Sequence, residues 1–190
     1  MQKVFLIRHG KVENPSNINY GTLDGFPLSA EGKNQIYNLA KSLNEMDSIF
    51  CKIIASPLQR TQETAVILSQ NLNTKIIIDD RLKEWDMGDW AGRPLTEFQE
   101  KSGYYDQEMN TNGMESLEDL SKRVIATIQD AIRSCDENII ICSHREPMAS
   151  ALIKLQKLPW ISIHKVDMPM ASVWQLDFID EEFISATKIF

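Results

Sequence analysis

Short apolar runs that alternate with helical patterns are the feature that most constrains how this chain folds. Four runs are rich in β-branched or other apolar residues, as strands buried on both faces of a sheet are. They cover residues 4–7, 51–55, 75–78 and 138–142, and two further strands are expected over 172–178 and 183–189. The alternation predicts an α/β fold: a three-layer α/β/α sandwich with a mostly parallel central sheet and helices on both faces.

Helices between the strands are indicated by N-capping residues and by apolar residues at helical spacing. Ser29 is expected to cap a helix that ends near residue 46, and Ser116 one that ends near residue 134. Ser56 is the expected N-cap of another helix, with Pro57 as its first residue. The remaining expectations are an ordered loop over 81–92, a short helix over 97–106, a turn over 109–113 and a helix that ends near 157.

The composition is that of an ordinary globular chain, and we expect a single domain over residues 1–190. A net charge of −7 argues against a nucleic acid or an anionic membrane as partner. The N-terminal apolar run is too short for a signal peptide, and no run has the length that crosses a bilayer.

The cysteines are scattered along the chain and odd in number: they are Cys51, Cys135 and Cys142. This pattern favours buried free thiols, because disulfide frameworks use paired cysteines in oxidising compartments. We therefore expect a cytoplasmic protein whose cysteines are reduced.

Basic residues and histidines follow three of the predicted strands. Arg8, His9 and Gly10 follow the first, Arg60 lies in the first turn of the helix after the second, and His144 follows the strand at 138–142. Such strand ends converge in an open α/β sheet, at the edge where these folds bind ligands. A tetrahedral phosphoryl group is the anion that best joins guanidinium and imidazole groups. On local grounds alone, a salt bridge at the first strand end and a solvated Arg60 remain alternatives.

Acidic residues that could supply a proton lie in the predicted loop over 81–92. Glu84, Asp86 and Asp89 are the candidates, with ordinary turn chemistry as the alternative. With a carboxyl group added, the basic residues and histidines at the strand ends would comprise a nucleophile, charge stabilisers and a proton donor. These are the parts of a phosphoryl transfer that proceeds through a covalent intermediate.

Several motifs occur in a fixed order along nearly the whole chain. They are Arg8-His9-Gly10, Pro27-Leu28-Ser29 with Gly32 and Gln35, Ser56-Pro57-Leu58-Gln59-Arg60-Thr61 with Thr64-Ala65, Leu82 and Glu84 with Gly88, Trp90 and Gly92, Glu115-Ser116 with Arg123-Val124, and Ser143-His144. In this order and spacing they resemble the signature of the histidine phosphatase superfamily, which includes cofactor-dependent phosphoglycerate mutase. The resemblance favours the phosphatase branch and implies a phosphoglycerate mutase-like fold.

The resemblance also implies a role for each of five residues. His9 would be the nucleophile that becomes phosphohistidine, and Arg8, Arg60 and His144 would hold the phosphoryl oxygens. Glu84 would protonate the leaving oxygen and then take a proton from the attacking water. No metal or other cofactor is implied, because the cations supply the electrostatic stabilisation, and the sequence shows no evident metal-ligand cluster.

Two departures from the family pattern concern substrate binding. Arg145 and Glu146 stand where Gly-Gly usually follows the second histidine. Arg145 could bind a second anionic group of the substrate or form a salt bridge with Glu146, which itself competes with Glu84 as proton donor. Pro15 stands where the family usually has an asparagine, and Asn14 or Asn17 could take the role of that asparagine.

We therefore expect a metal-independent phosphomonoester hydrolase that acts on a small soluble phosphorylated metabolite. The alternatives are a phosphoglycerate mutase and, from another class, a non-catalytic phosphate-binding module. Substrate specificity should reside in residues 11–26 and 93–113, both of which are irregular in sequence. The sequence leaves the oligomeric state open, with a homodimer as one possibility.

Overall fold

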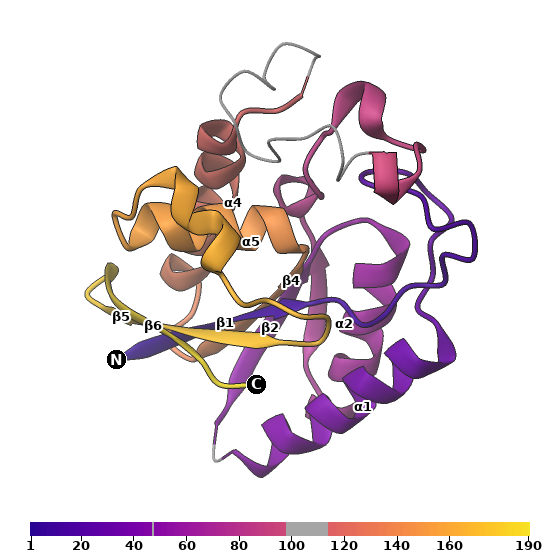
Figure 1. Cartoon of the computed structure of the whole chain (residues 1–190). Coiled ribbons are helices and arrows are strands. Elements are labelled where there is room, and N and C mark those ends of the chain that lie inside the picture. The colour runs from indigo at the N-terminus through magenta and orange to yellow at the C-terminus, as the bar shows by residue number, and fades with distance from the viewer. Residues whose placement is uncertain (47, 98–113) are drawn as a thin grey trace.

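The strands form one six-stranded sheet in the order β3-β2-β4-β1-β5-β6 in the computed structural model, which describes residues 1–46, 48–97 and 114–190. Strands β1 to β4 are parallel, whereas β5 and β6 are antiparallel to their neighbours (Figure 1). The mostly parallel sheet and both C-terminal strands are thus confirmed. The strands are β1 Gln2–Arg8, β2 Phe50–Ala55, β3 Lys75–Ile78, β4 Asn138–Ser143, β5 Val173–Ile179 and β6 Glu182–Lys188.

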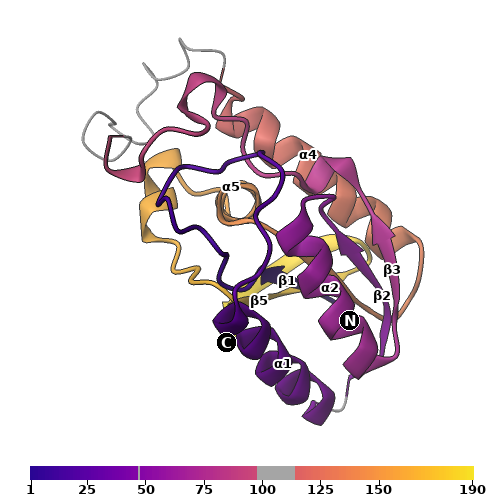
Figure 2. The same ribbon diagram turned by 90° about the vertical axis from the view of Figure 1, so that its right-hand side faces the viewer.

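Helices cover both faces of the sheet, as Figures 1 and 2 show. Helices α1 and α2 pack together on one face, and α4 and α5 on the other. The helices are α1 Ala30–Glu45, α2 Gln59–Leu72, α4 Leu117–Arg133 and α5 Arg145–Leu155, and the 3₁₀ turns are η1 Asp80–Leu82, η2 Gly88–Trp90 and η4 Trp160–Lys165. This arrangement confirms the predicted three-layer sandwich.

The two hydrophobic cores explain why β1 is apolar without interruption. Val4 and Leu6 point to one face and pack with residues of α4 and α5. Phe5 and Ile7 point to the other face, into the core that α1 and α2 complete. Successive side chains of a strand alternate between faces, so a strand covered on both sides needs apolar residues at every position.

The predicted caps of α1 and α4 are confirmed, whereas that of α2 is wrong. The Ser29 hydroxyl accepts a hydrogen bond from the Gly32 amide, and Ser116 accepts one from Asp119, both at 3.0 Å. Helix α2 begins later than expected, at Gln59, and its N-cap Leu58 has no side-chain bond. The Ser56 hydroxyl is used for a tertiary contact instead.

A disulfide bond corrects the prediction that all cysteines are free. Cys51 is bonded to Cys135 across a sequence separation of 84 residues. Strand β2 pairs with β4, which brings the start of β2 beside the segment that precedes β4. Cys142 is free and buried, as expected.

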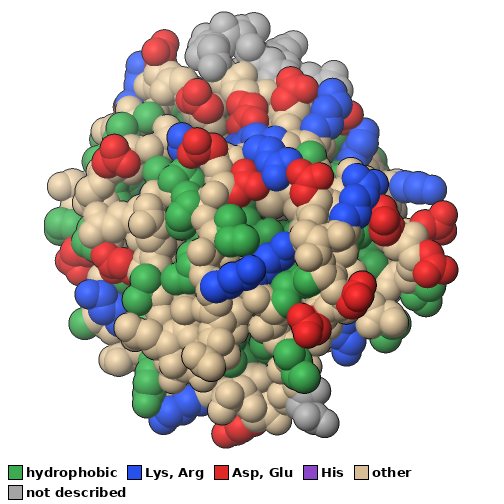
Figure 3. All heavy atoms as spheres, turned by 180° about the vertical axis from the view of Figure 1, so that it is seen from behind, with side chains coloured by type: hydrophobic (Ala, Val, Ile, Leu, Met, Phe, Trp, Pro, Cys, Tyr) green, Lys and Arg blue, Asp and Glu red, His purple; other side chains and the backbone are tan. Residues whose placement is uncertain are grey.

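The helix predicted over 97–106 lies, apart from its first residue, outside the described residues, as does the turn predicted over 109–113. The ordered loop predicted over 81–92 contains the end of η1 and all of η2. In the described ranges no helix has the length and apolar character that a bilayer span requires. On the face seen in Figure 3, the described acidic and basic side chains are interspersed.

Close packing between glycines fixes the long connection after β1. A Cβ atom on Gly10 would lie 2.6 Å from the carbonyl oxygen of Gly32 in α1, closer than any side chain tolerates. Farther along, this connection pairs with itself at Val12 and Leu28, and Ile18 bridges to Pro94. Gly10 therefore allows the backbone of the connection to approach α1, and the loop is held at the carboxyl ends of the strands.

Candidate active site

The sheet order brings the predicted site residues together at the carboxyl ends of β1, β2 and β4. Arg8 is the register partner of Ser143 on the adjacent strand, so the residues that follow, His9 and His144, become neighbours. Their imidazole ring centroids lie 5.2 Å apart. Arg60 enters from the first turn of α2 and Glu84 from the segment after η1.

His9 is held in one tautomer by the backbone of the next residue. Its Nδ1 atom lies 2.8 Å from the Gly10 carbonyl oxygen. A carbonyl oxygen only accepts, so Nδ1 carries the proton and Nε2 keeps its lone pair. Burial, followed by the charges of Arg60 and Arg8, lowers the pKa of His9 well below its usual value. His9 is therefore neutral near pH 7, with a nucleophilic Nε2 atom.

Arg60 is a buried cation rather than a solvated one, with 1% of its surface exposed. Its Nε donates to Nδ1 of His144 at 3.2 Å, and its NH2 donates to the Gly21 carbonyl oxygen at 2.7 Å. The guanidinium carbon lies 4.7 Å from the ring centroid of Tyr20. Arg60 thus ties the connection after β1 to the second histidine, and the solvated alternative is wrong.

His144 is also neutral and oriented. A guanidinium only donates, so Nδ1 of His144 must accept from Arg60, which leaves the proton on Nε2. Nε2 lies 2.8 Å from the Ser56 hydroxyl oxygen, which can accept a hydrogen bond from it. Burial first, and the nearby cations after it, lower the pKa of His144. Ser56, predicted as a helix cap, therefore positions this imidazole.

Glu84 is the one buried carboxyl group among the three acidic candidates of its segment. Its Oε1 accepts from the Trp85 amide at 2.8 Å, and its Oε2 lies 3.8 Å from Nδ1 of His144. Burial, reinforced by the charge of Glu146, raises the pKa of Glu84 to about 8. Glu84 is thus mostly protonated at neutral pH. Asp86 and Asp89 are exposed, and Asp86 accepts from the Gly88 amide in a turn.

Arg145 and Glu146 form an ion pair, which confirms the salt bridge predicted as one alternative for this dipeptide. NH1 of Arg145 lies 3.1 Å from Oε1 of Glu146. NH2 of Arg145 lies 3.4 Å from the Ile163 carbonyl oxygen and 3.5 Å from that of Val166, near the end of η4. Arg145 thereby fastens the start of α5 to η4. A role for it in binding a second anionic group stays a prediction.

A cavity of about 420 Å³ is lined by other residues of this site. Two of the five predicted catalytic residues, Arg8 and Glu84, lie in its wall, together with Arg145 and Glu146. Arg8 donates to the Met168 carbonyl oxygen at 2.7 Å, and its buried Nε has no hydrogen-bond partner in the described part of the chain. Such a donor is suited to an oxyanion.

Asn14 and Asn17 also line this cavity. The Asn14 amide donates to the Ile18 carbonyl oxygen at 2.9 Å and accepts from the Ile18 amide at 3.3 Å, so it shapes its own loop. Asn17 adopts a left-handed backbone, with φ of 48°, in the same loop. Contact of either amide with phosphate remains a prediction.

Other residues of the site were missed by sequence reasoning. Tyr20 and Gly21 contact Arg60 from an irregular loop that carries no periodic signal. Thr64 accepts from the Gly10 amide at 3.4 Å. Its place one helical turn after Arg60 is the signal that could have indicated it, because both then face the same side of α2.

Known proteins are similar to this chain in sequence and in fold. The family model of the histidine phosphatase superfamily (branch 1) matches residues 4–188. A probable phosphoglycerate mutase, GpmB, of Salmonella paratyphi C is 28% identical over 98% of this chain and 89% of its own length.

Two solved structures have the same fold. The mycobacterial glucosyl-3-phosphoglycerate phosphatase Rv2419c has a TM-score of 0.82 at 24% identity, covering 99% of this chain and 97% of its own. A phosphoserine phosphatase from Entamoeba histolytica has a TM-score of 0.81 at 22% identity, covering 97% and 94%. With a family model matched over nearly its whole length, the chain belongs to the histidine phosphatase superfamily.

Proposed function

We propose that this protein is a metal-independent phosphomonoester hydrolase that acts through a phosphohistidine on His9. Nε2 of His9 attacks phosphorus while the bond to the ester oxygen breaks, and Glu84 gives its proton to that oxygen, which leaves as an alcohol. Ionised Glu84 then takes a proton from water as the water attacks the phosphohistidine. Inorganic phosphate leaves, and both residues return to their starting states.

The observation that carries this proposal is the pairing of a neutral His9 with a protonated Glu84 at one edge of the sheet. The Gly10 carbonyl leaves the lone pair of His9 on Nε2. Burial raises the pKa of Glu84 to about 8, which supplies the acid that the first step needs. Arg8 and Arg60 would stabilise the charge that develops on the phosphoryl oxygens.

Hydrolysis of p-nitrophenyl phosphate in the presence of a chelator is the first test. We expect turnover by the wild-type protein, and a fall of more than about 1,000-fold in His9→Ala, because the nucleophile is lost. His164→Ala is the matched control, since His164 is exposed and lies outside the site. Equal inactivity of wild type and His9→Ala from acid to neutral pH would favour the non-catalytic phosphate-binding module.

A mutase is the second candidate, because one relative is named a probable phosphoglycerate mutase. The two enzymes differ in the fate of the phosphohistidine, which a mutase must protect from water. We expect the phosphorylated protein to release inorganic phosphate in a single turnover, with or without added 3-phosphoglycerate. Transfer of the phosphoryl group to 3-phosphoglycerate in preference to water would replace hydrolysis by the mutase reaction.

The substrate is proposed to be a small soluble phosphorylated metabolite. The volume of the cavity, about 420 Å³, supports a leaving group of this size. Kinetics with a panel of sugar, amino-acid and glycerate phosphates would identify it. The ratio of kcat/KM values between wild type and Arg145→Gln across the panel would test whether Arg145 recognises a second anionic group.

A further inference from the structure

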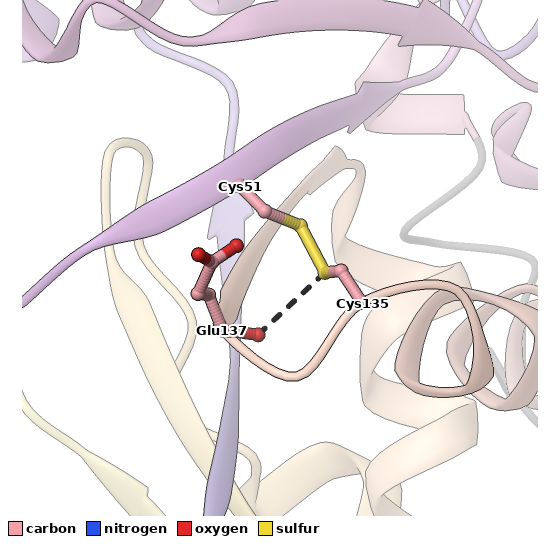
Figure 4. Close-up of side chains that lie close together, drawn as sticks. All are labelled: Cys51, Cys135 and Glu137. Atoms are coloured by element: carbon pink, nitrogen blue, oxygen red, sulfur yellow. Dashed lines mark hydrogen bonds between the residues drawn. A yellow bond between two sulfur atoms is a disulfide. The ribbon is translucent and has the colours of Figure 1, made fainter.

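A cluster of potential metal ligands lies at the opposite end of the sheet from the candidate active site. The Sγ atoms of Cys51 and Cys135 and a carboxylate oxygen of Glu137 are all within 4.8 Å of one another. Figure 4 shows them converging from the start of β2 and from the segment between α4 and β4. In the described ranges, this is the only group of three such ligands.

The backbone that carries these side chains is held by more than the disulfide bond. Phe50 pairs with Asn138 where β2 meets β4, which fixes the start of β2 against the segment that precedes β4. The Gln2 side-chain amide donates to the carbonyl oxygens of Cys135 at 2.6 Å and Glu137 at 3.0 Å. The two cysteines therefore keep neighbouring positions when the bond between their sulfurs is broken.

The metal ligands that this cluster offers depend on whether its two cysteines are oxidised or reduced. As a disulfide, the sulfurs offer no thiolate. After reduction, two thiolates and one carboxylate suit Zn²⁺, whose sites use soft sulfur ligands, better than Mg²⁺ or Ca²⁺, which prefer oxygen. Tetrahedral Zn–S bonds of about 2.3 Å require sulfurs about 3.8 Å apart.

The separation of the two cysteine backbones is compatible with both states. Their Cα atoms lie 6.9 Å apart. This is just beyond the range of about 4.4–6.8 Å that disulfides usually span. The sulfurs can therefore move apart around a metal ion with little movement of the backbone. Both cysteines are half-buried and Glu137 is exposed, so a reductant and a metal ion can reach the group.

We propose that Cys51, Cys135 and Glu137 form a redox-gated Zn²⁺ site, closed in the disulfide and opened by a dithiol reductant. The dithiol supplies two electrons and two protons; the S–S bond breaks, two thiols form, and the reductant becomes a disulfide. Zn²⁺ then displaces the two thiol protons, with water as its fourth ligand. This site goes beyond the proposed hydrolysis and does not depend on it.

Cobalt(II) is the probe for the test, because Co²⁺ bound to thiolates absorbs light in the near ultraviolet and visible. Reduced, metal-free protein is titrated with Co²⁺ and then with Zn²⁺, without free dithiol. We expect one equivalent of Co²⁺ to give thiolate-to-cobalt absorption, and Zn²⁺ to displace it. The oxidised protein should give none.

Variants identify the ligands. Cys51→Ser should lose the thiolate absorption, and Cys142→Ser, which removes a buried cysteine elsewhere, should keep it. Glu137→Gln changes one exposed carboxylate and should weaken Co²⁺ binding at least about tenfold. The proposal is overturned if the reduced protein gives no absorption, if Cys51→Ser keeps it, or if Glu137→Gln binds Co²⁺ as tightly as wild type.

Discussion

At the carboxyl ends of β1 and β4 the chain buries two histidines beside a cation, whereas at the amino end of β2 it joins Cys51 to Cys135. In the first region the side chains are arranged for a ligand. Arg60 holds His144, and both histidines are buried and kept neutral. In the second region a disulfide bond and two hydrogen bonds from Gln2 hold the backbone that precedes β4 in place.

This difference indicates how the fold separates reactivity from stability. Burial of a guanidinium and two imidazoles costs free energy, so the carboxyl end is costly to fold but ready to react. The disulfide closes a long loop, which restricts the unfolded chain. Substitutions of the buried site residues should therefore change rate, and substitutions of the disulfide should change the free energy of unfolding.

Among substitutions that leave His9 in place, Glu84→Gln should cause the largest loss of rate. Glutamine keeps the shape but cannot protonate the leaving oxygen, so kcat on an alkyl phosphate should fall by about 10²–10⁴-fold. The fall should be smaller on p-nitrophenyl phosphate, because p-nitrophenolate leaves without a proton. Steady-state kinetics on both substrates measure the contrast.

Glu146→Gln is the matched control for this change, since Glu146 lines the same cavity. It should slow the alkyl phosphate reaction far less than Glu84→Gln does. The reverse order would assign the proton donor to Glu146. Thermal unfolding of both variants should show that neither loss of rate comes from unfolding.

Cys51→Ser tests the other end of the sheet. In the oxidised protein it should lower the free energy of unfolding by about 2–4 kcal/mol, because an 84-residue separation is no longer cross-linked. Hydrolysis by the folded variant at 25 °C should equal that of wild type. Urea unfolding with and without a dithiol measures the effect.

The dithiol supplies the control for this variant. It should lower the stability of wild type to that of Cys51→Ser and leave the variant itself unchanged. If the loss of the disulfide slowed hydrolysis without unfolding the protein, the two ends of the sheet would be coupled, and the separation of rate from stability would be wrong.

Local patterns in the sequence were sufficient for most of the fold. The buried strands, the capped helices α1 and α4 and the C-terminal hairpin each follow from neighbouring residues. Ser56 shows where such reasoning stops: its hydroxyl contacts His144, 88 positions away, in preference to the helix that follows it. The Cys51–Cys135 bond has the same origin, because it depends on β2 pairing with β4.

The candidate site was accessible from sequence for a different reason. His9, Arg60 and His144 each follow a strand, and parallel strands end at a common edge, so position along the chain predicts proximity. The choice of Glu84 over Asp86 rested on the family resemblance, and burial in the structure supplies its physical basis. Tyr20 could not be predicted, because its loop has no period.

Ser29→Ala should have a smaller effect on the free energy of unfolding than Cys51→Ser, at a residue near the candidate site. The hydroxyl caps α1 through the Gly32 amide and does not line the cavity. Its loss should lower the free energy of unfolding by about 1 kcal/mol and leave kcat/KM unchanged. Ser116→Ala removes the equivalent cap of α4 and should have a similar effect in urea unfolding. If kcat/KM fell with Ser29→Ala but not with Ser116→Ala, the cap of α1 would help to position the site.

The rate and the stability should both depend on pH through Glu84. Glu84 acts as an acid in the first step, so kcat/KM should fall as pH rises through about 8. The acidic limb should lie well below pH 6.5, because the pKa of His9 is lowered by burial. Stability should follow the same carboxyl group: a raised folded pKa contributes stability below the unfolded value near 4.5, and this is lost as pH rises through about 8.

Glu146→Gln should shift this dependence with little loss of rate at neutral pH. The charge of Glu146 is the second cause, after burial, of the raised pKa of Glu84. Without that charge, the basic limb of kcat/KM should move to lower pH, while the acidic limb, which reports His9, stays in place. A pH–rate profile of wild type and variant on an alkyl phosphate measures both limbs. An unmoved basic limb would mean that burial alone keeps Glu84 protonated, because the carboxylate of Glu146 would then be too well screened to act on it.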